Sequence, residues 1–245
     1  MNIEVNEYTQ DDVNILKSFK NNDTLCSMIF DENHKMHENV RKKILGICDK
    51  FIEFVGIEFF VHDIVLTGSL ANYKWSKYSD ADIHIVVDFE NSEYNPELLK
   101  ELFSAKKTVW NLHHNILIKG FDVEMYVQDV NEEHKSSGIY SILNNKWVIE
   151  PEKENVKIDN KKILNKADDI TKQYIDLLKK SKNSDVSSNV EKLSKKIIKF
   201  RKSGLAKNGE YSYENLTFKL LRRNGFMEKL FDLRNKVLDK KLSIQ

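Results

Sequence analysis

Two aspartates near position 80 have the type and spacing needed to bind a metal ion. Asp80 and Asp82 are one residue apart and open an apolar run, 81–89, that is typical of a strand. Side chains alternate between the two faces of a strand, so both carboxylates should lie on the same side. Because like charges at short range repel each other, the pair indicates a bound cation, and oxygen ligands suit Mg²⁺ or Mn²⁺.

A glycine and a serine precede this pair. Gly68 and Ser69 follow a buried strand predicted over 59–68, and a short helical segment is expected after them. Glycine lets the backbone approach a ligand closely, and N–H groups at a helix start favour a phosphate. The Ser69 hydroxyl adds a donor, while Lys74 and Lys77 either contact phosphate or are solvated. Together these residues predict a site for a metal-bound nucleoside triphosphate.

The elements that must position these residues alternate between helices and strands. Apolar residues at spacings of three and four predict helices over 9–20, 35–56 and 97–114. In the third helix the apolar side is expected to contain Leu98, Leu102, Ala105 and Val109. Residues 115–128 alternate between apolar and polar around Lys119-Gly120, and residues 139–149 are typical of a hairpin that turns at Asn144-Asn145.

From Pro151 onward the pattern is entirely helical. An amphipathic stretch after residue 158 is followed by a Ser-Asn linker over 181–189 and by a second stretch with Val190, Leu193 and Ile197 on one stripe. Ser212 is a candidate N-cap, and a last helix should cover roughly 226 to 241. The sequence therefore predicts an α+β chain with two domains, 1–155 and 156–245.

The net charge of +1 conceals an asymmetry between these two parts. Residues 156–245 contain 23 Lys and Arg against 11 Asp and Glu, whereas residues 1–155 contain 16 against 27. A basic half indicates a polyanionic partner such as RNA or DNA. Two other readings stay open, namely attraction between the two halves and solvated helix faces. Lys195 and Lys199, which lie away from the apolar stripe, are candidates for phosphate contact.

Composition excludes several classes of protein. With 40% hydrophobic and 31% charged residues, the chain is neither disordered nor built for a membrane, and no stretch approaches the ~18 apolar residues of a span. The polar N-terminus does not read as a secretory signal. Cys26 and Cys48 form neither a CxxC pair nor a disulfide framework, which favours a reducing cytoplasm.

The segment GSLANYKWSKYSDADIHIVVDF, followed later by FDVEMYVQD, resembles the signature of the DNA polymerase β-type nucleotidyltransferase superfamily. It is further similar to uncharacterised nucleotidyltransferase-domain proteins of bacteriophages, which would place the protein in the host cytoplasm. The resemblance covers about residues 60–130. It implies a five-stranded mixed sheet with flanking helices, and transfer of a nucleoside monophosphate from an NTP, ATP among the candidates, with loss of pyrophosphate.

The resemblance also implies a third carboxylate on a neighbouring strand. Asp122 and Glu124 both fit the apolar-acidic-apolar setting, and Glu124 is favoured because its flanking residues lie deeper in the strand. One Mg²⁺ or Mn²⁺ ion would be held by Asp80, Asp82 and the triphosphate, and a second would be bridged by the aspartates and the third carboxylate. The C-terminal helices would close the cleft, with Lys195 and Lys199 near the nucleotide.

The acceptor stays open at this point. A nucleic-acid end, a protein hydroxyl, a small molecule and a second nucleotide are all compatible with the sequence, and the basic half favours RNA or DNA. Base preference and oligomeric state are open as well. The alternative is a catalytically inactive protein of the same fold that binds nucleotide or RNA, or that interacts with a host system.

Overall fold

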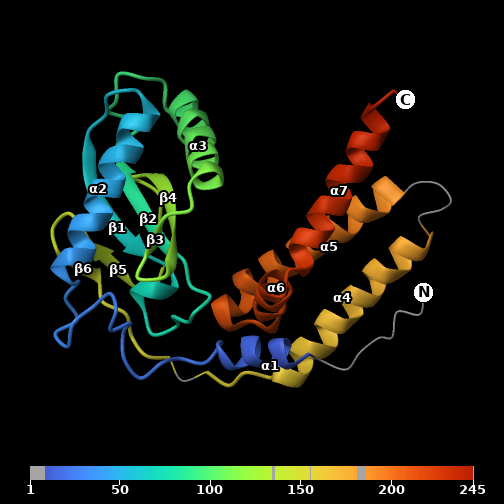
Figure 1. Cartoon of the computed structure of the whole chain (residues 1–245). Helices are drawn as coiled ribbons and strands as arrows, with labels where there is room; N and C mark the ends of the chain where they lie inside the picture. The colour runs from blue at the N-terminus through green and yellow to red at the C-terminus, as the bar shows by residue number, and fades with distance from the viewer. Residues whose placement is uncertain (1–8, 134–135, 155, 181–185, 245) are drawn as a thin grey trace. The chain divides into compact units, whose positions relative to one another are not determined.

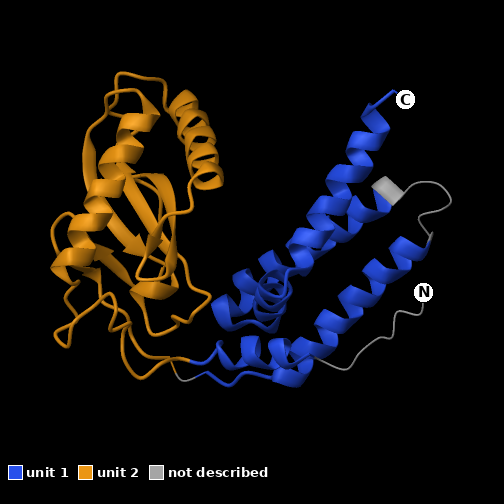
Figure 2. Cartoon of the chain, in the orientation of Figure 1, with its two compact units in different colours: residues 1–20, 156–245 blue, residues 21–155 orange. Residues whose placement is uncertain are grey.

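A computed structural model describes residues 9–133, 136–154, 156–180 and 186–244. The chain divides into two compact units, residues 21–155 and residues 1–20 with 156–245 (Figure 2). The first unit holds a mixed sheet and two long helices, and the second is all helical, so the predicted α+β class is confirmed. The sequence predicted that residues 1–155 form the first domain. In the structure, residues 1–20 belong to the helical unit instead.

The sheet of the first unit has six strands. Their bounds are β1 Val61–Thr67, β2 Ala81–Val87, β3 Leu117–Ile118, β4 Phe121–Asp129, β5 Ile139–Ser141 and β6 Lys146–Ile149. Their order is β3-β4-β2-β1-β5-β6, with β2 and β4 parallel and all other neighbours antiparallel. The expectation of five strands is therefore wrong by one. Positive φ angles at Lys119 and Gly120 form a tight turn that folds the two-residue β3 back onto β4.

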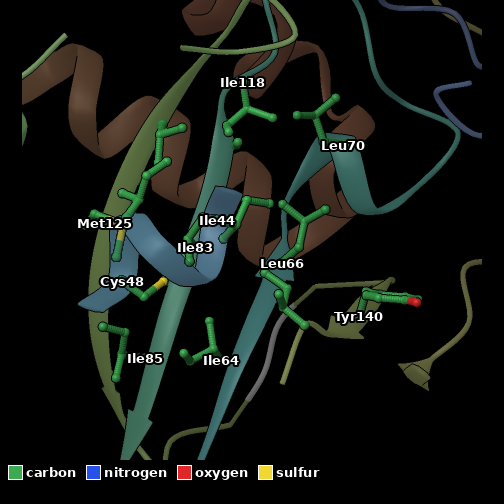
Figure 3. Close-up of a cluster of buried hydrophobic side chains, with 14 of the residues drawn as sticks. Ile44, Cys48, Ile64, Leu66, Leu70, Ile83, Ile85, Ile118, Met125 and Tyr140 are labelled. Atoms are coloured by element: carbon green, nitrogen blue, oxygen red, sulfur yellow. The ribbon is translucent and has the colours of Figure 1, made fainter. Parts of the chain in front are cut away.

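Two helices, α2 (Glu38–Val55) and α3 (Pro96–His113), belong to this unit and lie against the sheet (Figure 1). Ile44 and Cys48 of α2 join one buried cluster with the strand residues Ile64, Ile83 and Met125 (Figure 3). Because side chains alternate along a strand, this packing turns the residues between them toward the other face. Asp82 and Glu124 therefore lie on the face that is opposite this core.

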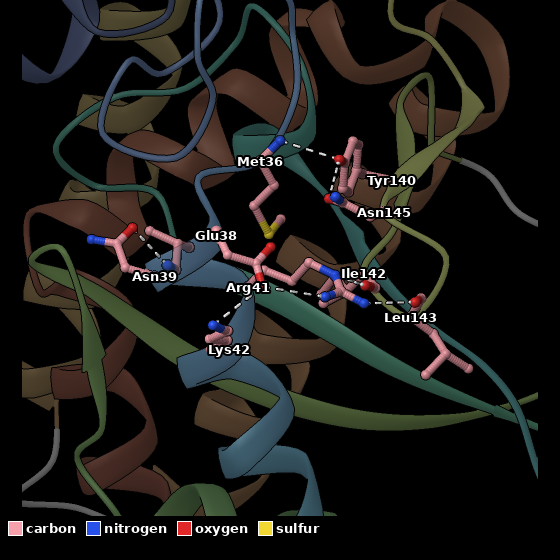
Figure 4. A network of polar contacts seen from close by, with 10 residues as sticks. Met36, Glu38, Asn39, Arg41, Lys42, Tyr140, Ile142, Leu143 and Asn145 are labelled. Atoms are coloured by element: carbon pink, nitrogen blue, oxygen red, sulfur yellow. Dashed lines mark hydrogen bonds and ion pairs between the residues drawn. The ribbon is translucent and has the colours of Figure 1, made fainter.

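The start of α2 is tied to the β5–β6 hairpin (Figure 4). The Arg41 guanidinium donates from Nε to the carbonyl oxygen of Ile142 at 2.7 Å and from Nη2 to that of Leu143 at 2.8 Å. The Tyr140 hydroxyl accepts from the N–H of Met36 at 3.1 Å and donates to the Asn145 side chain at 2.8 Å. These bonds satisfy backbone groups at the β6 end of the sheet, away from β4.

The apolar side of α3 differs from the expected one. Asn95 caps the helix by accepting from the N–H of Leu98, but the side chain of Leu98 is 64% exposed, and Val109 is also exposed. Leu99, Phe103 and Trp110 are buried instead. Both stripes have helical spacing, and the buried one carries two aromatic rings, which remove more apolar surface from water.

Among its described residues, the helical unit contains α1 (Gln10–Lys17) and four further α-helices. Their bounds are α4 Asn160–Lys180, α5 Val186–Asn208, α6 Tyr213–Arg223 and α7 Phe226–Leu242. The predicted cap at Ser212 is confirmed, because its hydroxyl accepts from the N–H of Asn215 at 3.3 Å. Arg223 donates to the Ser18 hydroxyl at 2.7 Å and Asn224 donates to Asp12 at 3.1 Å, which explains why the first residues group with this unit. In the described part of the chain, no helix has the length and apolarity needed to cross a membrane.

Candidate active site

The predicted carboxylates lie on two adjacent, parallel strands. Asp82 is the second residue of β2, and it pairs directly with Glu124 of β4. Paired residues of neighbouring strands project from the same face of a sheet, so the two carboxylates extend side by side. Asp80 immediately precedes β2, and Asp122 lies two residues before Glu124. Glu124 is half-buried, whereas Asp122 is exposed and pairs with Leu117 of the edge strand β3.

Gly68 places the backbone directly against the Asp82 carboxylate. Its φ of 71° and ψ of −155° belong to a region that is essentially reserved for glycine. A Cβ atom added to Gly68 would lie 2.0 Å from Oδ2 of Asp82 and 3.0 Å from its Cγ. The N–H of Gly68 donates to the Ser136 hydroxyl at 3.3 Å, and its carbonyl accepts from Asn72 at 2.9 Å. The Gly-Ser turn and the aspartate thus share one tightly packed location.

Ser69 is held by the segment that leads to the aspartates. Its hydroxyl donates to the Ser79 hydroxyl at 2.7 Å, and Ser79 in turn accepts from the N–H of Ser76 at 2.9 Å. The short helical segment expected after the turn is confirmed as one 3₁₀ turn, Ser69–Ala71. Phosphate binding at this turn stays a prediction, and three residues align too few peptide dipoles to contribute much to it.

A cavity of about 360 Å³ opens beside the carboxylates. It is lined by Asp80, Asp122 and Glu124 on the sheet side and by residues 111–116 at the end of α3. Asn111 holds this wall in place, because its side chain accepts from the N–H and donates to the carbonyl of Met125, both at 3.0 Å. The space next to the predicted metal ligands is thus bounded by three carboxylates together with amide, histidine and apolar side chains.

Tyr126 is the residue of this face that was not predicted from the sequence. Its hydroxyl donates a hydrogen bond to Oε2 of Glu124. Burial, this bond, and the charges of Glu124, Asp82 and Asp80 raise the pKa of the phenol above its usual value. The phenol therefore stays protonated, as a hydrogen-bond donor to Glu124 must be. A signal existed in the sequence, because Tyr126 follows Glu124 by two residues and so shares its face.

Comparison with known families supplies the classification. The sequence model of the family described as "Nucleotidyltransferase domain" matches residues 48–204, which is more than half of the chain. The chain belongs to this family. The matched range runs from α2 through the whole sheet to α5, so it contains the Gly-Ser turn and the candidate residues Asp80, Asp82, Asp122 and Glu124. No curated protein and no solved structure matched the chain, so the likeness to bacteriophage proteins stays a prediction.

The four lysines predicted to bind nucleotide lie in different settings. Lys74 is largely buried and pairs with Glu154 at 3.4 Å, while Lys77 is exposed and its ammonium lies 5.0 Å from the centre of the Tyr78 ring. Lys195 and Lys199 are exposed on α5 in the helical unit, and Lys195 pairs with Glu191 at 2.7 Å. Phosphate contact by these four lysines stays a prediction.

The donor atoms of the candidate site would suit a divalent cation that is also bound by phosphate oxygens. Within the described residues, no group of three or more His, Cys, Asp or Glu side chains is arranged to hold a metal ion by itself. Mg²⁺ in nucleotide sites is usually bound by one or two carboxylates together with substrate phosphates and water. Asp82 and Glu124, at the same level of neighbouring strands, supply two such carboxylates.

Proposed function

We propose that this nucleotidyltransferase uses Mg²⁺ or Mn²⁺ to transfer a nucleoside monophosphate from an NTP to a hydroxyl group of an acceptor. The observation that carries the proposal is the pairing of Asp82 with Glu124, with the Asp82 carboxylate packed against the backbone of Gly68. This arrangement concentrates negative charge at a glycine-lined turn, where a cation and a phosphate chain can both approach. Asp80 and the cavity beside it extend the same site.

The reaction breaks the bond between the α-phosphorus and the oxygen that bridges to the β-phosphate. The acceptor oxygen forms the new bond to phosphorus, and pyrophosphate leaves with the bonding electron pair. When bound, the metal stabilises the attacking and leaving oxygens. Asp80, Asp82 and Glu124 would hold it, Ser69 would orient phosphate, and Glu124 or water would take the acceptor's proton. Such a site accelerates the transfer mainly by positioning and charge neutralisation.

For the acceptor, the proposal is the hydroxyl end of RNA or DNA. It is supported by the charge of residues 156–245, which contain 23 basic and 11 acidic residues, and by the exposure of Lys195 and Lys199. Binding of a polyanion by such residues should weaken steeply as salt is raised. That the helical unit closes over the nucleotide also stays a prediction.

We also propose that the protein works in a reducing cytoplasm. Cys26 and Cys48 are free and buried, and burial raises the pKa of the Cys48 thiol to about 12. Thiols of this kind are unreactive and contribute to packing as small apolar groups.

The first test is turnover itself. Purified protein is incubated with each of the four NTPs, labelled at the α-phosphate, with Mg²⁺ or Mn²⁺ and with RNA, DNA and small hydroxyl compounds as acceptors. We expect metal-dependent pyrophosphate release together with transfer of label to one class of acceptor. If every combination fails to turn over while nucleotide or RNA still binds, the protein is a non-catalytic binder and the proposal is wrong.

A second prediction separates the two candidates for the third carboxylate. Glu124→Gln and Asp122→Asn are matched isosteric changes on the same strand, and both side chains line the same cavity. We expect Glu124→Gln to lower kcat at least about 100-fold, because it removes the negative charge beside Asp82. This decrease is comparable to the effect of removing one group that stabilises a transition state. Asp122→Asn should stay within a few-fold of wild type. The reverse order in a pyrophosphate-release assay would assign the role to Asp122.

A further inference from the structure

The environment of Tyr126 is built around the hydroxyl that contacts Glu124. Tyr126 pairs with His84 across β2 and β4, two residues along the strands from the pair formed by Asp82 and Glu124 and therefore on the same face. The rings of His84 and Tyr126 stack with centroids 4.7 Å apart and planes at 21°. Nζ of Lys107, from α3, lies 4.7 Å from the centroid of the Tyr126 ring. The ring is therefore restrained by two neighbouring groups.

The stack is fixed in turn by a hydrogen-bonded partner. Nδ1 of His84 lies 2.8 Å from Oε1 of Gln128, and Gln128 donates to the carbonyl of Glu132 at 3.3 Å. Gln128 is buried and lies two residues beyond Tyr126 on β4. The chain of contacts from Gln128 through His84 to Tyr126 ends at the carboxylate of Glu124. A carboxylate on a flexible side chain is thereby held at one of its two oxygens.

We propose that Tyr126 is a positioning residue, whose hydroxyl holds Oε2 of Glu124 and leaves the other carboxylate oxygen to bind the divalent cation. This inference rests on the proposed function, because it assigns Glu124 to the metal site. Groups that hydrogen-bond to a metal ligand fix its orientation, and their loss commonly weakens metal affinity by roughly 10-fold or more. A bond to one oxygen also disfavours binding of the cation by both oxygens, so it influences the geometry as well as the affinity.

The test is the affinity for Mn²⁺, measured by the electron paramagnetic resonance signal of the free ion in the presence of a non-hydrolysable NTP analogue. Tyr126→Phe keeps the ring and its stacking on His84 but removes the hydroxyl. We expect the Mn²⁺ dissociation constant to rise roughly 10-fold. An affinity equal to that of wild type overturns the inference.

Tyr140→Phe is the matched control. It removes a hydroxyl in the same unit that makes two hydrogen bonds, but those bonds reach Met36 and Asn145 rather than a carboxylate. We expect it to lower the melting temperature and to leave the Mn²⁺ affinity unchanged. If both Phe variants weaken Mn²⁺ binding equally, the effect of Tyr126 is a general loss of packing and the positioning role is wrong.

A spectroscopic measurement gives an independent readout. Metal binding at Glu124 should weaken or strengthen the bond from the Tyr126 hydroxyl, and so change the ultraviolet absorption of that tyrosine. We expect a metal-dependent difference spectrum in wild type and in Tyr140→Phe, and a loss of that component in Tyr126→Phe. A difference spectrum identical in wild type and in Tyr126→Phe overturns the inference.

The outcomes separate this inference from the proposed function. If wild type turns over NTP and Glu124→Gln abolishes turnover, but Tyr126→Phe binds Mn²⁺ normally, only the role of Tyr126 is wrong. If wild type binds Mn²⁺ with the predicted dependence on Tyr126 but never turns over, the metal site stands and the enzyme proposal fails. If wild type does not bind Mn²⁺ even with the nucleotide analogue, both are wrong.

Discussion

Asp82→Asn should abolish NMP transfer while the protein remains folded. The change keeps the size of the side chain and its place against Gly68 but removes the charge that faces Glu124. Because the proposed chemistry relies on charge neutralisation by metal held between these carboxylates, we expect kcat to fall at least about 1,000-fold, or about 4 kcal/mol of transition-state stabilisation. Pyrophosphate release at saturating NTP and metal measures the effect.

The melting temperature provides the control for this variant. Asp82 pairs with Glu124 on the neighbouring strand, and Asp80 precedes it by two residues. Removing one of several like charges relieves repulsion in the folded state, so Asp82→Asn should melt at the same temperature as wild type or above it. Lost activity together with a lower melting temperature would point to misfolding. Retained activity would exclude Asp82 as a metal ligand.

Periodicity predicted most of the elements of this fold. The apolar spacing of Val40, Ile44, Ile47 and Phe51 predicted α2, and Gly56 ends it with a φ of 80°. The alternation around Lys119-Gly120 and the turn at Asn144-Asn145 correspond to the hairpins β3–β4 and β5–β6. These features depend on residues that are close together in the chain. They can therefore be predicted from one sequence.

The apolar side of α3 shows where this reasoning stops. Leu98, Leu102, Ala105 and Val109 have helical spacing, but so do Leu99, Phe103 and Trp110 on the adjacent stripe. Which stripe is buried is decided by tertiary partners. Trp110 lies 5.5 Å from Phe51 of α2, and Phe103 lies 5.2 Å from Phe59, measured between ring centroids. Such contacts join residues more than 40 positions apart, so they cannot be predicted from local sequence patterns.

The same distinction applies to the candidate site. The Gly-Ser turn and the two aspartates form a local motif, so their proximity was predictable from spacing. The register of β4 against β2 could not be predicted from spacing. This register places Glu124, rather than Asp122, directly beside Asp82. The hydrogen bond from the N–H of Gly68 to the Ser136 hydroxyl joins residues 68 positions apart, so it too could not be predicted from spacing. Strand register therefore had to come from the structure.

Gly68→Ala should disable the site through one methyl group. The Cβ atom would lie 2.0 Å from Oδ2 of Asp82, so the carboxylate or the turn has to move. The φ of 71° with ψ of −155° adds a backbone cost of order 1–3 kcal/mol for any other residue. Because displacement of a ligand by about 1 Å can cost about 100-fold in rate, we expect kcat to fall at least about 100-fold. The measurements are pyrophosphate release and the midpoint of urea unfolding.

Gly56→Ala is the matched control for this change. Gly56 also has a positive φ, 80°, but the nearest atom to an added Cβ is the Phe54 carbonyl oxygen at 3.9 Å, which is an ordinary contact. It ends α2 in the same unit, so its substitution should cost about 1 kcal/mol in stability through backbone strain alone, with kcat unchanged. If the two alanine variants lose stability equally and both keep full activity, the close packing of the turn on Asp82 does not serve the reaction. If only Gly68→Ala loses activity, the turn holds the aspartate in its working position.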